Sequence, residues 1–145
     1  MISKVVRQGV YSSTSMQVVI PRESPLKVST DKLAANLSTL NDIAELGEDW
    51  NGYGAAPTSH FVIDEATRVI FSLNEQPDAI FPTGRKSVQF EYHLPNSYLE
   101  FEIFDERIVA MQVIATDYDN ARFWEFSHED IWRAKKIVDD FVNAQ

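Results

Sequence analysis

The chain contains no cysteine, and this absence excludes several kinds of chemistry. Disulfide bonds, thiolate nucleophiles, zinc–thiolate centres and iron–sulfur clusters all need cysteine sulfur. Long apolar runs are absent too: no segment approaches the ~20 apolar residues of a membrane-spanning helix. The first twenty residues also lack the continuous apolar run of a signal peptide. We therefore expect a soluble, cytoplasmic protein without membrane contact.

Basic residues are scarce, with 13 Lys and Arg against 22 Asp and Glu and a net charge of −9. Phosphate backbones repel such a surface, so direct nucleic-acid binding is not expected unless the cations cluster. An acidic surface keeps a protein soluble. The sharper interpretation is that it meets a partner protein with a basic surface.

The residues that are present indicate a single domain spanning 1–145. Hydrophobic residues make up 44% and aromatic residues 12% of 145 residues, enough for a core without covalent or metal cross-links. We see no repeat, low-complexity tract or domain boundary. Residues 1–28 contain a short strand-like stretch interrupted by Pro21 and Pro25, which predicts a flexible arm or one added edge strand.

Three segments carry apolar residues at helical spacing. Their candidate N-caps are Ser29 or Thr30, Thr58 or Ser59, and Ser127. The first helix is predicted to end at Gly47, where a left-handed residue is usual. The third is predicted to bury a stripe that runs from Ile131 to Val142.

Three segments alternate between apolar and polar residues, as strands with one buried face do. The residues predicted to face the core are Val88, Phe90, Tyr92 and Leu94; Leu99, Phe101 and Ile103; and Val109, Met111, Val113 and Ala115. Matching the apolar faces places Phe90 opposite Ile103. Residues 74–86 are interpreted as a connecting loop. The prediction is α+β: two N-terminal helices, a three-stranded antiparallel meander and a C-terminal helix packed on one face of the sheet.

The loop "LGEDWNGYGAAPTSH", residues 46–60, lies between the first two predicted helices. Asn51-Gly52 is a strong turn dipeptide, and Gly54 offers a second position for positive φ. As a structural corner, the loop would bury the rings of Trp50 and Tyr53 where the helices diverge. Alternatively, Trp50, Asn51 and Tyr53 recognise a partner, because tryptophan and tyrosine are enriched at binding hot spots. A catalytic loop is a third interpretation, but no spacing here matches a known mechanism.

The polar face of the meander is the second candidate site. The predicted register places Glu91 opposite Glu102 and His93 opposite Glu100. This face could be merely solvated, or it could bind a basic partner, or its carboxylates and histidine could hold a divalent cation. No metal or nucleotide motif is present, so we expect no cofactor and assign no catalytic residue.

Residues 116–130, "TDYDNARFWEFSHED", combine aromatic and acidic side chains before the last predicted helix. Such clustering favours a hydrophobic plug that joins sheet to helix. The alternative is an exposed acidic–aromatic patch for protein contact.

The sequence "DWNGYGAAP", between a leucine-striped helix and a second helix, resembles a group of small uncharacterised bacterial proteins. Their shared loop motif is Trp, Asp or Asn, Gly or Ser, then Tyr-Gly-Ala, and a strand pair similar to "SVQFEYHL" and "YLEFEIF" follows it. The resemblance covers about residues 33–113. Such proteins are often encoded near mobile-element, phage-defence or toxin–antitoxin genes, which implies an accessory or neutralising role.

Together these features predict a non-enzymatic, acidic interaction domain that neutralises or inhibits a toxin or defence component by occlusion. Its binding residues would be Trp50, Asn51, Tyr53, Glu91, His93, Glu100 and Glu102. The alternative is a metal-assisted hydrolase that uses the four residues of the acidic sheet face. The expected partner is a protein with a basic surface, and homo-oligomerisation is compatible with the sequence.

Overall fold

The computed structural model describes the backbone of residues 25–144 and the side chains of residues 30–144. Within this range the helices are α1 (Pro25–Ala44), α2 (His60–Ser72) and α3 (Trp132–Asn143), with short 3₁₀ turns η1 (Tyr118–Asn120) and η2 (His128–Asp130). The strands are β1 (Ala79–Pro82), β2 (Val88–Leu94), β3 (Ser97–Ile103), β4 (Ile108–Val113) and β5 (Arg122–Phe126). The predicted α+β class is confirmed.

The sheet has five strands in the order β1-β2-β3-β4-β5, each antiparallel to its neighbours, and not the predicted three. Strand β1 lies in the segment interpreted as a loop. It has only four residues and ends at Pro82, so it lacks the alternation that marks a longer strand. Strand β5 lies in the aromatic segment. Its two faces both carry aromatic side chains, which hides the period of two.

The helices begin and end at somewhat different residues than predicted. Helix α1 already begins at Pro25, a residue well suited to a first helical turn, so it includes residues that were assigned to the predicted arm. Residues 1–24 lie outside the described residues. Helix α1 ends at Ala44, and Gly47 has no positive φ, so the predicted left-handed cap is wrong. The cap of α2 is confirmed, because Ser59 Oγ accepts the N–H of Val62 at 3.2 Å.

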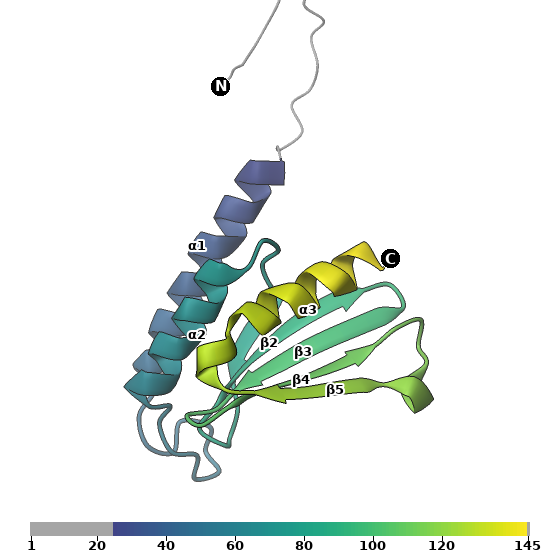
Figure 1. Ribbon diagram of the computed structural model, residues 1–145. Helices are drawn as coiled ribbons and strands as arrows, with labels where there is room; N and C mark the ends of the chain where they lie inside the picture. Colours follow the sequence, from purple (N-terminus) through teal and green to yellow (C-terminus); the bar gives the residue numbers. More distant parts are fainter. Residues whose placement is uncertain (1–24, 145) are drawn as a thin grey trace, which may run out of the picture.

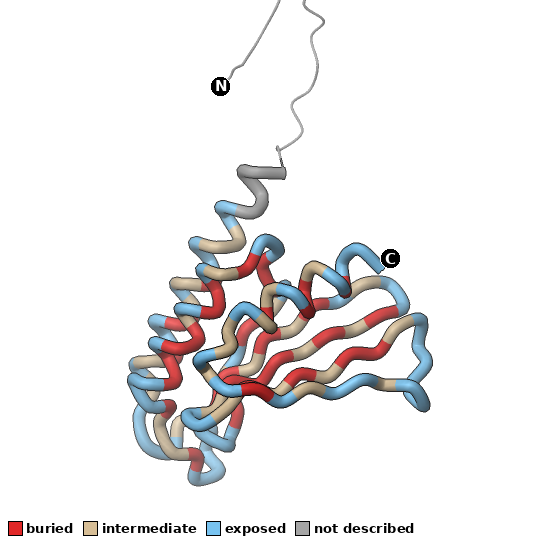
Figure 2. The backbone as a smooth tube through the Cα atoms, viewed as in Figure 1, coloured by how far each residue is buried: buried red, intermediate tan, exposed pale blue. Residues whose placement is uncertain are grey.

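The described helices lie on one side of the sheet, where α2 and α3 cover the strands and α1 packs on α2 beside the edge strand β1 (Figure 1). Burial alternates along the central strands, and the core fills the space between sheet and helices (Figure 2). Its largest fully buried side chains include Phe90, Phe101 and Phe141. Within the described range, no helix combines the length and hydropathy that crossing a membrane requires.

The turn between β2 and β3 is shorter than the matched apolar faces suggest. Leu94 pairs with Ser97, so only two residues connect the strands, and Phe90 lies opposite Phe101. The predicted pairing of Phe90 with Ile103 is therefore wrong by two residues. A shift of two leaves every side chain on its predicted face, because the side-chain period of a strand is two.

The side chains of β4 that point toward the helices are the opposite set from the predicted one. Ile103 pairs with Ile108, which directs Ile108, Ala110 and Gln112 to the helix side and places Val109 and Met111 on the outer face. The strand "IVAMQV" is apolar on both faces, so its hydrophobic pattern does not choose between them. The turn after β3 makes the choice.

Candidate functional site

The loop after α1 is a turn that is stabilised by hydrogen bonds between its own residues. Gly52 and Gly54 have φ of 76° and 84°, which confirms the predicted positive-φ positions. The side-chain oxygen of Asn51 accepts the backbone N–H groups of Tyr53 at 2.8 Å and Ala55 at 3.2 Å. An asparagine that bonds to nearby backbone in this way stabilises a turn. Asn51 is therefore explained as a structural residue.

The two aromatic residues of this loop have different environments. Trp50 is half-buried, and its indole N–H donates to the carbonyl of Ala56 at 3.1 Å. Tyr53 is 92% exposed, so the prediction that both rings are buried is wrong for Tyr53. The turn leaves the Tyr53 ring in solvent. Of the three predicted binding residues here, Tyr53 is the one whose side chain makes no hydrogen bond within the described residues.

Glu102 is a buried structural carboxylate. It lies opposite Gln89, not Glu91, and its side chain is 9% exposed. Arg85 donates to both of its oxygens, from Nε at 3.0 Å and from Nη2 at 2.8 Å, and Ser87 Oγ donates to it as well. Burial opposes ionisation, but these donors outweigh it and hold the pKa of the Glu102 carboxyl below its ordinary value. Glu102 is not available for docking.

Glu91 and Glu100 form a carboxylate pair, since they lie directly opposite each other on β2 and β3. The hydroxyl of Tyr98 lies 2.9 Å from Glu91 and 2.7 Å from Glu100 and bridges them. His93 pairs with Tyr98, and its Nε2 contacts Glu91 at 2.9 Å. Burial opposes ionisation of Glu91, yet hydrogen bonds from Tyr98, His93 and Gln89 hold its pKa below the ordinary value. Burial and both carboxylates raise the pKa of the Tyr98 hydroxyl.

The predicted site residues therefore form three separate groups. The Trp50–Tyr53 loop, the carboxylate pair with His93, and Glu102 with Arg85 share no hydrogen bond or ion pair among the described residues. Among the side chains of residues 30–144, no three histidines or carboxylates are grouped as a metal site requires. Of the four residues proposed for a hydrolase, Glu91, His93 and Glu100 lie together, whereas Glu102 is held by Arg85.

The outer face also carries an apolar patch, and the sequence analysis anticipated only its part in residues 116–130, as the alternative to a buried aromatic plug. We call it the outer patch: Val109, Met111 and Phe123, the last being 71% exposed. It lines a hollow of about 430 Å³ with Glu100 and Glu125 at its sides. This arrangement depends on which face of β4 points outward, because Val109 and Met111 lie on the outer face only in the observed pairing. The alternation in "RFWEF" would have revealed Phe123 only once β5 was recognised as a strand.

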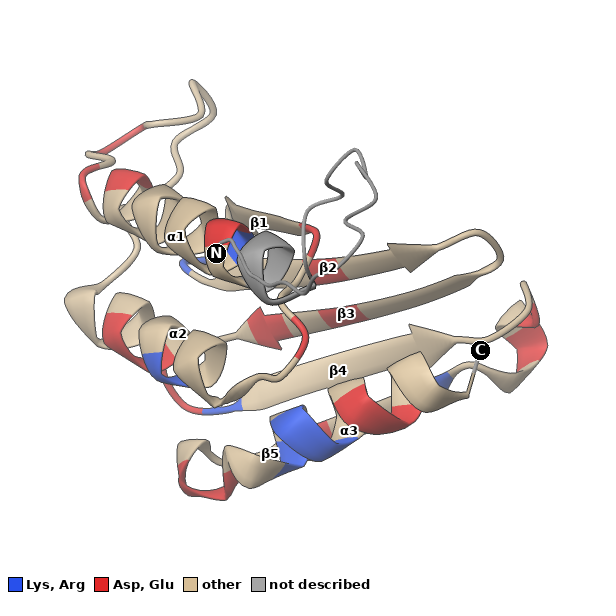
Figure 3. Cartoon of the chain, turned by 90° about the horizontal axis from the view of Figure 1, so that it is seen from above, with Lys and Arg blue, Asp and Glu red and all other residues tan. Residues whose placement is uncertain are grey.

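A second hollow lies between the sheet and α3, on the helix side. This α3 cavity has a volume of about 590 Å³. Its lining includes Gln112, Arg122, Trp124, Arg133, Lys136 and Ile137. Helix α3 carries basic residues in its first half and acidic residues in its second half, and further acidic residues are spread over the molecule (Figure 3). The spacing 133, 136, 137 places these side chains on one helix face, which is the signal that sequence reasoning could have used.

Comparison with protein-family models, with curated proteins and with solved structures gives no match.

Proposed function

We propose that the chain is a non-enzymatic interaction domain that binds another protein through the outer face of its sheet. The observation that carries the proposal is Phe123, which is 71% exposed beside Met111 on a face that no described helix covers. Aromatic residues and methionine are enriched in the buried centre of protein interfaces. A ring of this kind is a natural anchor for a pocket on a partner.

The charge around the outer patch favours a basic partner. Glu100 and Glu125 line the same hollow as Phe123, and the whole chain carries a net charge of −9. Complementary charges at the border of an apolar contact speed association and suppress wrong partners. The partner that fits is a protein with an apolar surface bordered by Lys and Arg. Following the sequence resemblance, we infer a toxin or defence component whose working surface is blocked by occlusion.

The metal-assisted hydrolase is the weaker interpretation. Both oxygens of Glu102 accept hydrogen bonds from Arg85, which leaves this carboxylate occupied. Glu91 and Glu100 share the hydroxyl of Tyr98 on an open sheet face. An open face suits binding by surface contact better than it suits chemistry on an enclosed substrate.

The test compares what the chain captures from its native host before and after Phe123→Ser. The matched control is Phe71→Ser, because Phe71 is 63% exposed on α2, away from the outer face. Quantitative mass spectrometry should show a basic protein that wild type and Phe71→Ser retain and Phe123→Ser loses. Equal capture by all three proteins would overturn the assignment. Capture that survives Phe123→Ser and disappears in Tyr53→Ala would move the docking element to the loop.

The captured protein, once purified, tests the role of charge. Glu125→Gln should slow its association at low salt, and Glu129→Gln, an exposed change on η2, should not. The difference should vanish near 1 M salt, where the Debye length is about 3 Å. Association rates that ignore both substitutions would count against charge complementarity at this face.

A further inference from the structure

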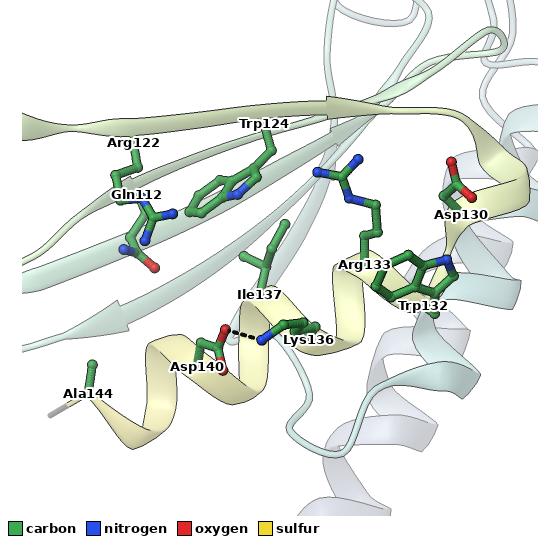
Figure 4. A pocket seen from close by; sticks show the side chains of 10 residues that line it. All are labelled: Gln112, Arg122, Trp124, Asp130, Trp132, Arg133, Lys136, Ile137, Asp140 and Ala144. Atoms are coloured by element: carbon green, nitrogen blue, oxygen red, sulfur yellow. Dashed lines mark hydrogen bonds and ion pairs between the residues drawn. The ribbon is translucent and has the colours of Figure 1, made fainter.

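We infer that the α3 cavity binds a small organic anion, with a phosphate or carboxylate head and a flat aromatic body. The cavity lies on the helix side of the sheet, so the inference does not depend on the docking face. Its volume of about 590 Å³ falls within the range of ligand pockets, roughly 300–1,000 Å³. The side chains of Gln112, Arg122 and Trp124 project from the sheet toward α3, and Arg133 and Ile137 project toward them (Figure 4).

Gln112 is the first observation that points to a ligand. Its side chain lines the cavity and the residue is only 8% exposed, yet its carboxamide makes no hydrogen bond to any described residue. The Gln112 amide is not among the fully buried, unpaired polar atoms of the described residues, so it is accessible from the cavity and its donors and acceptor are open to a ligand. A ligand in the cavity would find an unoccupied hydrogen-bonding group there.

The basic side chains are the second observation. Among the described residues, no carboxylate lies within ion-pair distance of Arg122 or Arg133, although most other cations are paired. Arg122 is cross-strand partner of Gln112, so guanidinium and carboxamide enter the cavity together. Lys136 adds a third cation but is paired with Asp140 at 2.9 Å.

The net charge of the cavity lining has the opposite sign to the net charge of the whole chain. Three cations and two carboxylates, Asp130 and Asp140, line it, which gives +1 against −9 for the whole chain. A guanidinium forms bidentate hydrogen bonds with phosphate or carboxylate groups. A small anion is preferred over a nucleic-acid chain, because polymer binding typically uses 6–10 phosphate contacts and would meet the acidic remainder of the surface.

The apolar part of the lining selects the body of the ligand. Trp124 is half-buried, and the Arg122 guanidinium lies over its ring at 4.8 Å from the centroid. Ile137 faces the same space from α3 (Figure 4). The indole N–H of Trp124 donates to no described residue. A flat ring would pack between these groups, with its charged head near Arg122.

The experiment is calorimetric titration of the full chain with AMP and with naphthoate, an aromatic phosphate and an aromatic carboxylate. Inorganic phosphate and adenosine test the head and the body separately. We expect saturable binding of AMP or naphthoate, and the stronger of the two identifies the head group. Quenching of tryptophan fluorescence should accompany it, since Trp124 and Trp132 line the cavity.

Arg122→Gln should weaken binding about tenfold or more, as the loss of a charged hydrogen bond does. The matched control is Lys135→Gln, which removes the same charge from α3, where Lys135 pairs with Asp139 and does not line the cavity. Its affinity should equal that of wild type. Gln112→Leu keeps the volume and should also weaken binding.

Three results would overturn the inference. The first is the absence of saturable binding of both aromatic anions at millimolar concentration. The second is an equal loss of affinity in Arg122→Gln and Lys135→Gln, which would indicate only a general effect of charge. The third is binding of inorganic phosphate or adenosine as tight as that of AMP, because one half of the proposed ligand would then contribute nothing.

Discussion

Replacing Glu102 with Gln should lower the free energy of unfolding by about 2 kcal/mol at neutral pH, because this carboxylate is buried and charge-paired. Its side chain is 9% exposed, and three hydrogen bonds from Arg85 and Ser87 reach it. A glutamine retains the volume and one acceptor oxygen. Its NH₂ group, however, would face the donors that the carboxylate accepts.

The magnitude follows from how well each donor is shielded from water. Arg85 is 64% exposed, so its ion pair contributes about 1 kcal/mol or less. Ser87 is fully buried, so its hydrogen bond to a charged acceptor contributes about 1.5 kcal/mol, the lower end for bonds to charged groups. The sum is about 2 kcal/mol, which for a domain of this size lowers the melting temperature by roughly 8 °C.

The pH dependence has a definite sign. The folded protein holds the pKa of Glu102 below the reference value of 4.5, because the hydrogen bonds from Arg85 and Ser87 outweigh the effect of burial. A carboxyl with a lowered folded pKa stabilises the fold fully above its unfolded pKa and loses that contribution as the pH falls through the folded value. The difference between wild type and Glu102→Gln should therefore shrink below about pH 4.5.

Urea unfolding followed by circular dichroism at neutral pH and at about pH 3 measures both quantities. The control is Glu100→Gln on the same strand, which should be neutral or slightly stabilising, because Glu100 lies opposite Glu91 and like charges so placed repel. Equal stability of Glu102→Gln and wild type at neutral pH would refute the reasoning. A deficit of the same size at both pH values would refute the part that concerns charge.

Three further predictions concern the loop after α1. Gly52→Ala should lower stability by about 1–2 kcal/mol because φ is 76°, whereas Gly47→Ala, without positive φ, should be neutral; equal melting temperatures of the two variants would contradict this. Trp50→Phe should lose about 1 kcal/mol in chemical unfolding, since the carbonyl of Ala56 loses its donor at 3.1 Å, and an unchanged midpoint would show that water replaces it. Tyr53→Ser should leave the melting temperature within about 2 °C of wild type, because the ring is 92% exposed; a larger fall would mean that the ring packs on the domain.

Local periodicity was sufficient to predict the faces of several elements. The stripe of α2, from Val62 to Ile70, is buried as its helical spacing predicts. Phe90 and Phe101 are buried on β2 and β3, where polar residues alternate with apolar ones. These elements have one apolar and one polar face, so the sequence of each element alone shows which face is buried.

The candidate sites depend on contacts between distant residues. Arg85 and Glu102 are brought together by the pairing of β2 with β3, and the two-residue turn between them sets that register. The sequence suggested a longer turn and assigned Glu102 to an open acidic face. No pattern within either strand distinguishes registers that differ by two residues, because both keep the same faces buried.

Which face of β4 is buried is determined only by the tertiary structure. Both faces of this strand are apolar, so its own sequence predicts burial of either one. Pairing Ile103 with Ile108 directs Gln112 into the α3 cavity and places Met111 beside Phe123 on the outer face. Both proposed sites follow from this choice. The physical reason is that adjacent side chains of a strand point to opposite faces of the sheet. The turn before β4 fixes which of its residues point to the helix side, and it thereby fixes which side chains line the cavity and which lie on the outer face.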